Sequence, residues 1–148
     1  MIAALVFGVV MVMPTSWKVV DVPNPPGSTV EVLTYTRGPK VRKFEQTINV
    51  IRKRYSDDAM LIGDWAAAAV NDLQAHEGVK ILENHPQDFC DIRGWIVEST
   101  GTYGGVKLDV LQEAILDGGW EYVASYTRIE GSEADADAMK AMGTLCPM

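Results

Sequence analysis

Two pairs of adjacent glycines divide residues 92–129 into three runs that are rich in β-branched and aromatic residues. Gly104-Gly105 follows the first run, and Gly118-Gly119 follows the second. Paired glycines adopt the positive φ angles that tight two-residue hairpins require. The spacing therefore predicts a three-stranded antiparallel meander with strands over residues 92–103, 106–116 and 120–129.

The last two of these runs place apolar residues at the period of two that a strand with one buried face shows. These positions are Val106, Leu108 and Val110 in one run, and Trp120, Tyr122, Ala124 and Tyr126 in the next. We expect both sets to share one face of the sheet. That face needs an apolar cover, and we expect helices to supply it.

Proline and glycine divide the chain ahead of the meander into further short runs of β character. The predicted strands cover residues 17–22, 29–36, 44–55 and 79–83. We expect Gly38-Pro39 to end the second of these strands. Asn84-His85-Pro86 predicts a turn between the fourth strand and the meander.

Two segments have the apolar spacing of amphipathic helices. Residues 56–76 carry the stripe Ile62, Ala66, Ala69, Val70 and Leu73, with Ser56 or Asp57 as the expected cap and Gly78 as the terminator. Residues 132–135 resemble a capping box, and Ala134, Ala138, Met142 and Leu145 give the second helix its apolar face. Pro147 is expected to end it.

The length of 148 residues suits one domain over residues 1–148. Its strands and helices are segregated rather than strictly alternating. This order predicts an α+β sandwich, in which a mainly antiparallel curved sheet is covered by the long helix and the C-terminal helix.

Residues 1–14 are almost wholly apolar and allow two interpretations. A run that is too short to span a bilayer, with no basic residue before it and no clear cleavage site, fits a targeting segment poorly. We favour a first strand over residues 6–13 that ends at Pro14. A remnant of an export segment is the alternative.

The net charge of −7 and the pI of 4.7 argue against nucleic acid or an anionic membrane as the main partner. Seven of the 13 basic residues nevertheless lie within residues 37–54. They are Arg37, Lys40, Arg42, Lys43, Arg52, Lys53 and Arg54. We interpret them as a solvated strand edge, where cations discourage edge-to-edge pairing, and an anion-binding patch is the alternative.

The chain resembles the PsbP-like superfamily, including its DcrB-type and LpqN-type bacterial proteins. The resemblance lies in landmarks spread over nearly the whole chain: the apolar run into Pro14-x-x-Trp17, the strand Thr47-Ile-Asn-Val-Ile51 before the long helix, Gly94-Trp95, the aromatic run from Trp120 to Tyr126, and the short closing helix. None of them is a catalytic signature. No cysteine stands in a lipobox near the start, so lipid anchoring is not supported.

This resemblance implies a curved antiparallel sheet flanked by helices and used as a non-enzymatic binding or assembly module. Relatives include extrinsic subunits of photosystem II, envelope lipoproteins and cytosolic chaperones for type VI secretion effectors. We therefore expect a cell-envelope binding protein that acts on another protein through its sheet surface. A cytosolic chaperone or adaptor for secretion effectors, which predicts a homodimer and reduced thiols, is the alternative.

Two cysteines are present: Cys90 precedes the meander, and Cys146 stands at the end of the last predicted helix. The expected fold brings both to one edge of the sheet, and we favour a disulfide over two unrelated thiols. Such a bond closes a long loop and stabilises the fold by roughly 4 kcal/mol on the chain-entropy model. It also favours a periplasmic or secreted location, whereas reduced thiols favour the cytoplasm.

A metal site or a nucleophile pair built from His76, His85 and Cys90 is the third hypothesis, with Glu83 as a further ligand. The spacing matches no standard zinc pattern, and the sequence contains no phosphate loop, dinucleotide motif or nucleophile elbow. We therefore expect no cofactor and no enzymatic activity. The aromatic residues Trp95, Trp120, Tyr122 and Tyr126 are expected in the core, and they are the candidate binding surface if the sheet exposes them.

Overall fold

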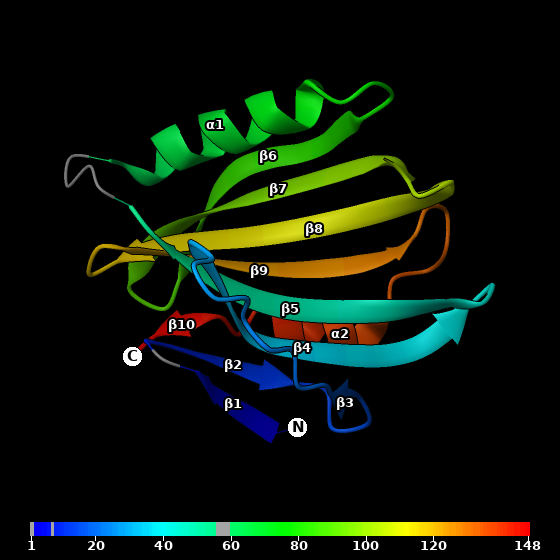
Figure 1. The fold of residues 1–148 in the computed structure, drawn as a ribbon, viewed down its shortest axis with the longest axis horizontal. Coiled ribbons are helices and arrows are strands. Elements are labelled where there is room, and N and C mark those ends of the chain that lie inside the picture. The colour runs from blue at the N-terminus through cyan, green and yellow to red at the C-terminus, as the bar shows by residue number, and fades with distance from the viewer. Residues whose placement is uncertain (1, 7, 56–59) are drawn as a thin grey trace.

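The computed structural model describes residues 2–6, 8–55 and 60–148 (Figure 1). In chain order the elements are β1 (Ile2–Val6), β2 (Val9–Met13), β3 (Lys18–Val19), β4 (Val30–Val41), β5 (Phe44–Arg54), α1 (Ile62–Gln74), β6 (Lys80–Phe89), β7 (Ile92–Tyr103), β8 (Val106–Asp117), β9 (Trp120–Ile129), α2 (Ala136–Met142) and β10 (Cys146–Pro147). The structure confirms the expected α+β class.

The strands form two sheets in which every pairing of the described residues is antiparallel. The long sheet has the order β3-β4-β5-β9-β8-β7-β6, and the short sheet has the order β1-β2-β10. The predicted meander is strands β7, β8 and β9. All four of its turn glycines have positive φ angles, between 59° at Gly104 and 84° at Gly119, which explains why glycine occupies these turns.

Two predicted strand ends were wrong because proline is tolerated where a strand has no partner on one side. Strand β4 continues through Gly38 and Pro39 with a register shift, at a point beyond its short pairing with β3. Strand β6 likewise continues through Pro86, which lies opposite Trp95. Strand β6 is the edge of the sheet and pairs with β7 alone. The missing N–H of Pro86 therefore interrupts no hydrogen bonds to a second neighbouring strand.

The long sheet is covered on both faces. Ala124 and its neighbour Val123 on β9 are both buried but belong to different apolar clusters, because successive side chains of a strand point to opposite faces. Val123 packs with Trp65 and Ala66 of α1, which defines the α1 face. Ala124 belongs to the cluster that holds α2 and strand β2, which defines the α2 face.

The expectation that the two helices share one apolar face was therefore wrong. The register of the β8–β9 hairpin places Leu111 opposite Tyr126 and Val110 opposite Thr127. Paired residues share a face, so Leu108 and Val110 point to the α1 face while Tyr122 and Tyr126 point to the α2 face. Figure 1 shows α1 running along β6 and β7, and α2 behind β4 and β5.

Both helix starts differ from the predicted caps. Asp64 Oδ2 accepts a hydrogen bond of 3.0 Å from the backbone N–H of Leu61, and the predicted caps Ser56 and Asp57 lie outside the described residues. At α2 the cap is Asp135, which accepts from the N–H of Ala138 at 2.9 Å. The hydroxyl of Ser132 instead donates to the carbonyl of Ile129. Leu145 is buried but follows the end of the helix.

The short sheet joins the two ends of the described chain. Strand β2 pairs with β1 and with β10, so the apolar N-terminal segment forms a hairpin instead of the single strand over residues 6–13 that we expected. Cys90 and Cys146 form the expected disulfide, with 5.5 Å between their Cα atoms. This bond ties the β6–β7 turn of the long sheet to β10 of the short sheet.

Candidate functional site

A row of polar side chains crosses the α1 face at the place where α1 no longer covers the sheet. Tyr35 of β4 lies opposite Asn49 of β5, which lies opposite Ser125 of β9, which lies opposite Gln112 of β8. We call these four residues the polar row. The next residue across the sheet is Val97 of β7, which is buried in the α1 cluster.

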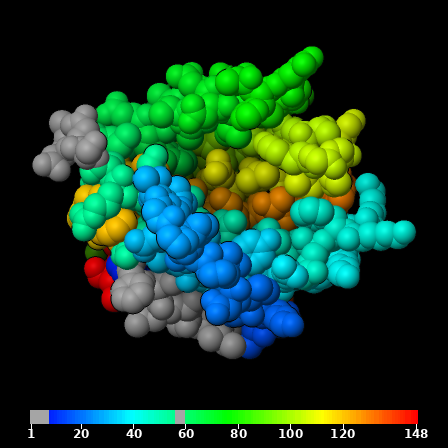
Figure 2. Space-filling model, viewed as in Figure 1, coloured from blue at the N-terminus to red at the C-terminus, as the bar shows by residue number. Residues whose placement is uncertain are grey.

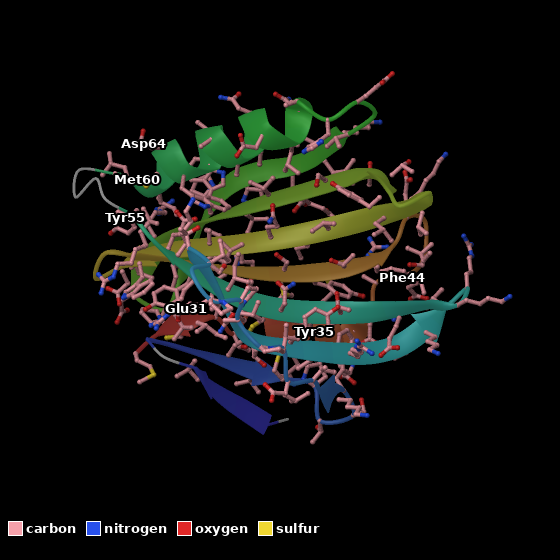
Figure 3. The ribbon with its side chains drawn as sticks, viewed as in Figure 1. Glu31, Tyr35, Phe44, Tyr55, Met60 and Asp64 are labelled. Atoms are coloured by element: carbon pink, nitrogen blue, oxygen red, sulfur yellow. A yellow bond between two sulfur atoms is a disulfide. The ribbon has the colours of Figure 1, made fainter. Side chains whose placement is uncertain are left out.

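The polar row is accessible to a partner. All four of its residues are partly exposed, and α1 packs on β6, β7 and β8. Figure 2 shows this face hollowed between α1 and the segment that precedes β4, and Figure 3 labels Tyr35 at its border. Within the described part of the chain the side chains of Asn49, Gln112 and Ser125 have no protein hydrogen-bond partner. Their amide and hydroxyl groups are therefore available to a ligand.

A second concave feature lies at the end of the long sheet where β5 ends and β9 begins. This pocket has a volume of about 370 Å³ and is lined by Ser28, Thr29, Glu31, Lys53, Arg54 and Trp120. The guanidinium carbons of Arg52 and Arg54 lie 4.0 and 4.3 Å from the centroid of a Trp120 ring, which is cation–π distance. We call it the Trp120 pocket.

The four aromatic residues of the predicted binding surface do not form one surface. Tyr122 and Tyr126 are 3% and 1% exposed and belong to the core of the α2 face. Trp95 lies on the other face, partly buried against the α1 cluster, and its indole N–H donates to Asn84 at 2.7 Å. Trp120 borders the Trp120 pocket.

The seven basic residues within residues 37–54 form two groups, one at each end of β5. Arg37, Lys40, Arg42 and Lys43 lie around the β4–β5 turn, whereas Arg52, Lys53 and Arg54 lie at the opposite end of β5. In the first group Arg37 pairs with Glu45 at 3.8 Å. In the second, Arg52 binds Glu31 through Nε and Nη2, both at 2.9 Å. Only this second group adjoins the Trp120 pocket.

The proposed histidine and cysteine site is not assembled among the described residues. His76 is exposed beyond the end of α1, whereas His85 lies on β6 with its Nε2 3.7 Å from Glu83. The sulfur of Cys90 is in the disulfide, where it is neither a thiolate ligand nor a nucleophile. The described residues contain no group of three or more His, Cys, Asp or Glu side chains placed to hold a metal ion.

Sequence reasoning missed two buried acidic groups on the α2 face. Glu113 of β8 is 2% exposed between Ile96 and Ala124, and burial raises its pKa to about 9. Within the described chain its Oε2 atom has no hydrogen-bond partner. The signal in the sequence is an acidic residue whose period-two neighbours, Leu111 and Ile115, are both apolar.

The other group joins Glu98, Asp109 and Arg128 of β7, β8 and β9. Arg128 Nη2 lies 3.4 Å from Asp109 and 3.9 Å from Glu98. Burial, and then the hydrogen bond and charge of Asp109, raise the pKa of Glu98 to about 7, and Arg128 opposes this shift. Arg128 also donates to the carbonyl of Ser132. The group therefore anchors the segment that leads into α2.

The described chain contains no helix that is both long and apolar enough to cross a membrane. No family model matches the sequence, and a search of curated proteins finds no relative. Solved structures do match it. LpqN of Mycobacterium tuberculosis, described as involved in cell envelope biogenesis, has a TM-score of 0.62 and 14% identity, and the match covers 92% of this chain and 76% of LpqN.

The cyanobacterial PsbP protein of Synechocystis, CyanoP, has a TM-score of 0.64 and 17% identity over 95% of this chain and 87% of its own. The fold is PsbP-like. A Pseudomonas aeruginosa protein of unknown function, PA94, has a TM-score of 0.65 and 15% identity over 89% of this PsbP-like chain and 97% of its own. At such identities the likeness concerns the fold.

Two of the PsbP-like landmarks have a packing explanation. A Cβ atom on Gly94 would lie 2.4 Å from the ring of Phe89 and 2.6 Å from the carbonyl oxygen of Ala114. The indole of Trp17 occupies the space beside Gly38, where a Cβ atom would approach it to 2.3 Å. Trp17 also meets Tyr126 edge-on, with ring centroids 6.1 Å apart. Gly94 and Trp17 therefore belong to the core.

Proposed function

We propose that this PsbP-like protein is a non-enzymatic binding or assembly protein of the bacterial cell envelope, and that it binds another protein at the polar row. The observation that carries the proposal is the row itself. Four strands present amide, hydroxyl and phenol groups in one line, in a hollow that α1 leaves open. Such groups bind the backbone or polar side chains of a partner with directional hydrogen bonds.

The proposed location has two supports. A disulfide persists in oxidising compartments and is rare in the cytosol, which favours the envelope over the cytosolic chaperone hypothesis. LpqN, which shares the fold, is described as involved in cell envelope biogenesis. The disulfide also argues against a metal site or nucleophile pair at His76, His85 and Cys90, because it makes Cys90 unavailable for metal binding or nucleophilic catalysis.

The test is purification of the tagged protein under native conditions from its own cells, with Ser125→Arg as the test variant. A long cation at Ser125 fills the hollow and displaces a partner from the polar row. Ala68→Arg is the matched control, because Ala68 lies on the exposed face of α1 and takes the same side chain. Both variants must retain the thermal midpoint of the wild type.

We expect the wild type and Ala68→Arg to elute in a complex with one stoichiometric protein from the envelope fraction, and Ser125→Arg to elute alone. A wild-type protein that elutes alone, or a partner that remains with Ser125→Arg, would contradict the proposal. Thiol labelling of the native protein tests the location. Reduced Cys90 and Cys146 in cells would favour the cytosolic hypothesis.

A further inference from the structure

The Trp120 pocket combines a preformed cation with a concave surface at a place separate from the polar row. Its lining contains two cations, Lys53 and Arg54, and one anion, Glu31. Its volume of about 370 Å³ is within the range of small-molecule sites and well above that of a single ion. The pocket therefore has room for an organic group that carries a charge.

Arg54 is the group best placed to bind that charge. Its guanidinium carbon stacks 4.3 Å from the centroid of the Trp120 ring, and its side chain is exposed toward solvent. A guanidinium that is already held over an aromatic ring loses little conformational freedom on binding. It presents its N–H groups in the fork geometry that matches a carboxylate.

Arg52 has a different role, although it also contacts Trp120. Its Nε and Nη2 both bind Glu31, and its charge lowers the pKa of Tyr122, which burial raises more strongly. Arg52 thereby holds Glu31 and Trp120 in place on either side of the pocket. It builds the pocket, whereas Arg54 supplies the cation that lies over Trp120, and Lys53 completes the lining beside Glu121 of β9.

The charge of the lining indicates which anion fits. Lys53 and Arg54 contribute two positive charges to the lining, and the negative charge of Glu31 is paired with Arg52. The pocket therefore attracts an anion, and the planar fork of the Arg54 guanidinium matches the two oxygens of a carboxylate. The hydroxyl of Thr29 adds a hydrogen-bond donor at the rim.

We propose that the Trp120 pocket binds a carboxylate-bearing ligand, with Arg54 as its principal contact and Lys53 as a second cation. The carboxylate belongs either to a small organic acid or to an acidic side chain of a peptide segment. The proposal goes beyond the polar row and does not depend on it. A negative result for one site does not affect the test of the other, because Ser125 lies outside the Trp120 pocket.

The experiment measures binding of a tetraglutamate peptide with an uncharged coumarin label by fluorescence anisotropy at low salt. Tetraglutamine with the same label is the control ligand. The test variant carries Lys53→Gln and Arg54→Gln. The matched control carries Arg42→Gln and Lys43→Gln at the other end of β5. Each variant loses two positive charges, so both change the net charge from −7 to −9.

We expect the wild type to bind tetraglutamate and not tetraglutamine. The pocket variant should lose at least tenfold in affinity, and the control variant should stay within twofold of the wild type. Trp120→Leu should also weaken binding severalfold, because Arg54 loses the ring that holds it. Equal losses in the two charge variants would overturn the proposal, because only the overall field would then matter.

Competition separates the sources of the carboxylate. Displacement of the labelled peptide by free glutarate, at concentrations similar to those at which unlabelled tetraglutamate displaces it, assigns the pocket to a small acid. Displacement only by longer acidic peptides assigns it to a protein segment, and both results support a carboxylate site. Absence of tetraglutamate and glutarate binding at millimolar concentration, or stronger competition by inorganic phosphate than by glutarate, would overturn it.

Discussion

The buried carboxyl group of Glu113 makes a quantitative prediction about stability and pH. Glu113 lies on the α2 face between Ile96 and Ala124, and burial raises its pKa from 4.5 to about 9. The folded protein therefore holds the Glu113 proton at neutral pH, whereas the unfolded chain releases it. Between these two pKa values the folded state binds more protons than the unfolded state, so stability falls as the pH rises.

The loss of unfolding free energy at pH 7 follows from the difference between pH 7 and the pKa of Glu113 in the unfolded chain. Each pH unit above 4.5 costs about 1.4 kcal/mol until the folded pKa is reached, so the cost of burying Glu113 at pH 7 is roughly 3 kcal/mol. Glu113→Gln keeps the shape of the side chain and replaces the O–H donor of the protonated carboxyl group with an N–H donor, but it does not titrate. The variant should therefore be more stable than the wild type by a margin that grows with pH.

Urea denaturation of the wild type and Glu113→Gln at pH 4, 5.5, 7 and 8.5 measures this margin. We expect a nearly constant difference in unfolding free energy at and below pH 4.5, followed by growth of roughly 3 kcal/mol up to pH 7. Glu130→Gln, at an exposed position, is the control and should show no such growth. A difference for Glu113→Gln that stays constant from pH 4 to pH 8.5 would refute the assignment of a protonated carboxyl group.

Three further predictions concern stability and use chemical denaturation as the assay. Cys90→Ser with Cys146→Ser should lower the unfolding free energy by about 4 kcal/mol, because the bond closes a loop between residues 56 positions apart; an unchanged midpoint after reduction would contradict this. Gly94→Ala should cost about 1–3 kcal/mol through overpacking against Phe89, and a neutral result would show that the ring moves freely. Asp135→Ala should cost about 1 kcal/mol through loss of the α2 cap, whereas Asp135→Asn should retain most of the stability.

The parts of the fold that depend on local chemistry could be predicted from the sequence. The paired glycines at 104–105 and 118–119 identify their hairpins because their positive φ angles are a local requirement. The apolar spacing of Ile62, Ala66 and Val70 predicts α1 for a similar reason. The disulfide was a correct expectation once the order of elements placed both cysteines at one edge.

The parts that depend on the position of a strand within the sheet could not be predicted. Pro86 resembles a turn residue until β6 is known to be the edge strand, and Leu145 resembles a helical core residue until the chain is seen to turn into β10. The polar row illustrates the same limit for function. Its four residues come from four strands, and only the register of these strands brings them into one line.

Site-specific photo-crosslinking in living cells tests most directly the proposal that a partner protein binds at the polar row. A benzophenone side chain at Gln112 lies in the row, and the same group at Ala68 lies on the exposed face of α1. We predict that the probe at Gln112 forms one dominant crosslink to a single envelope protein and that the probe at Ala68 does not. Crosslinking that is absent at Gln112, or equally strong at both positions, would contradict the account.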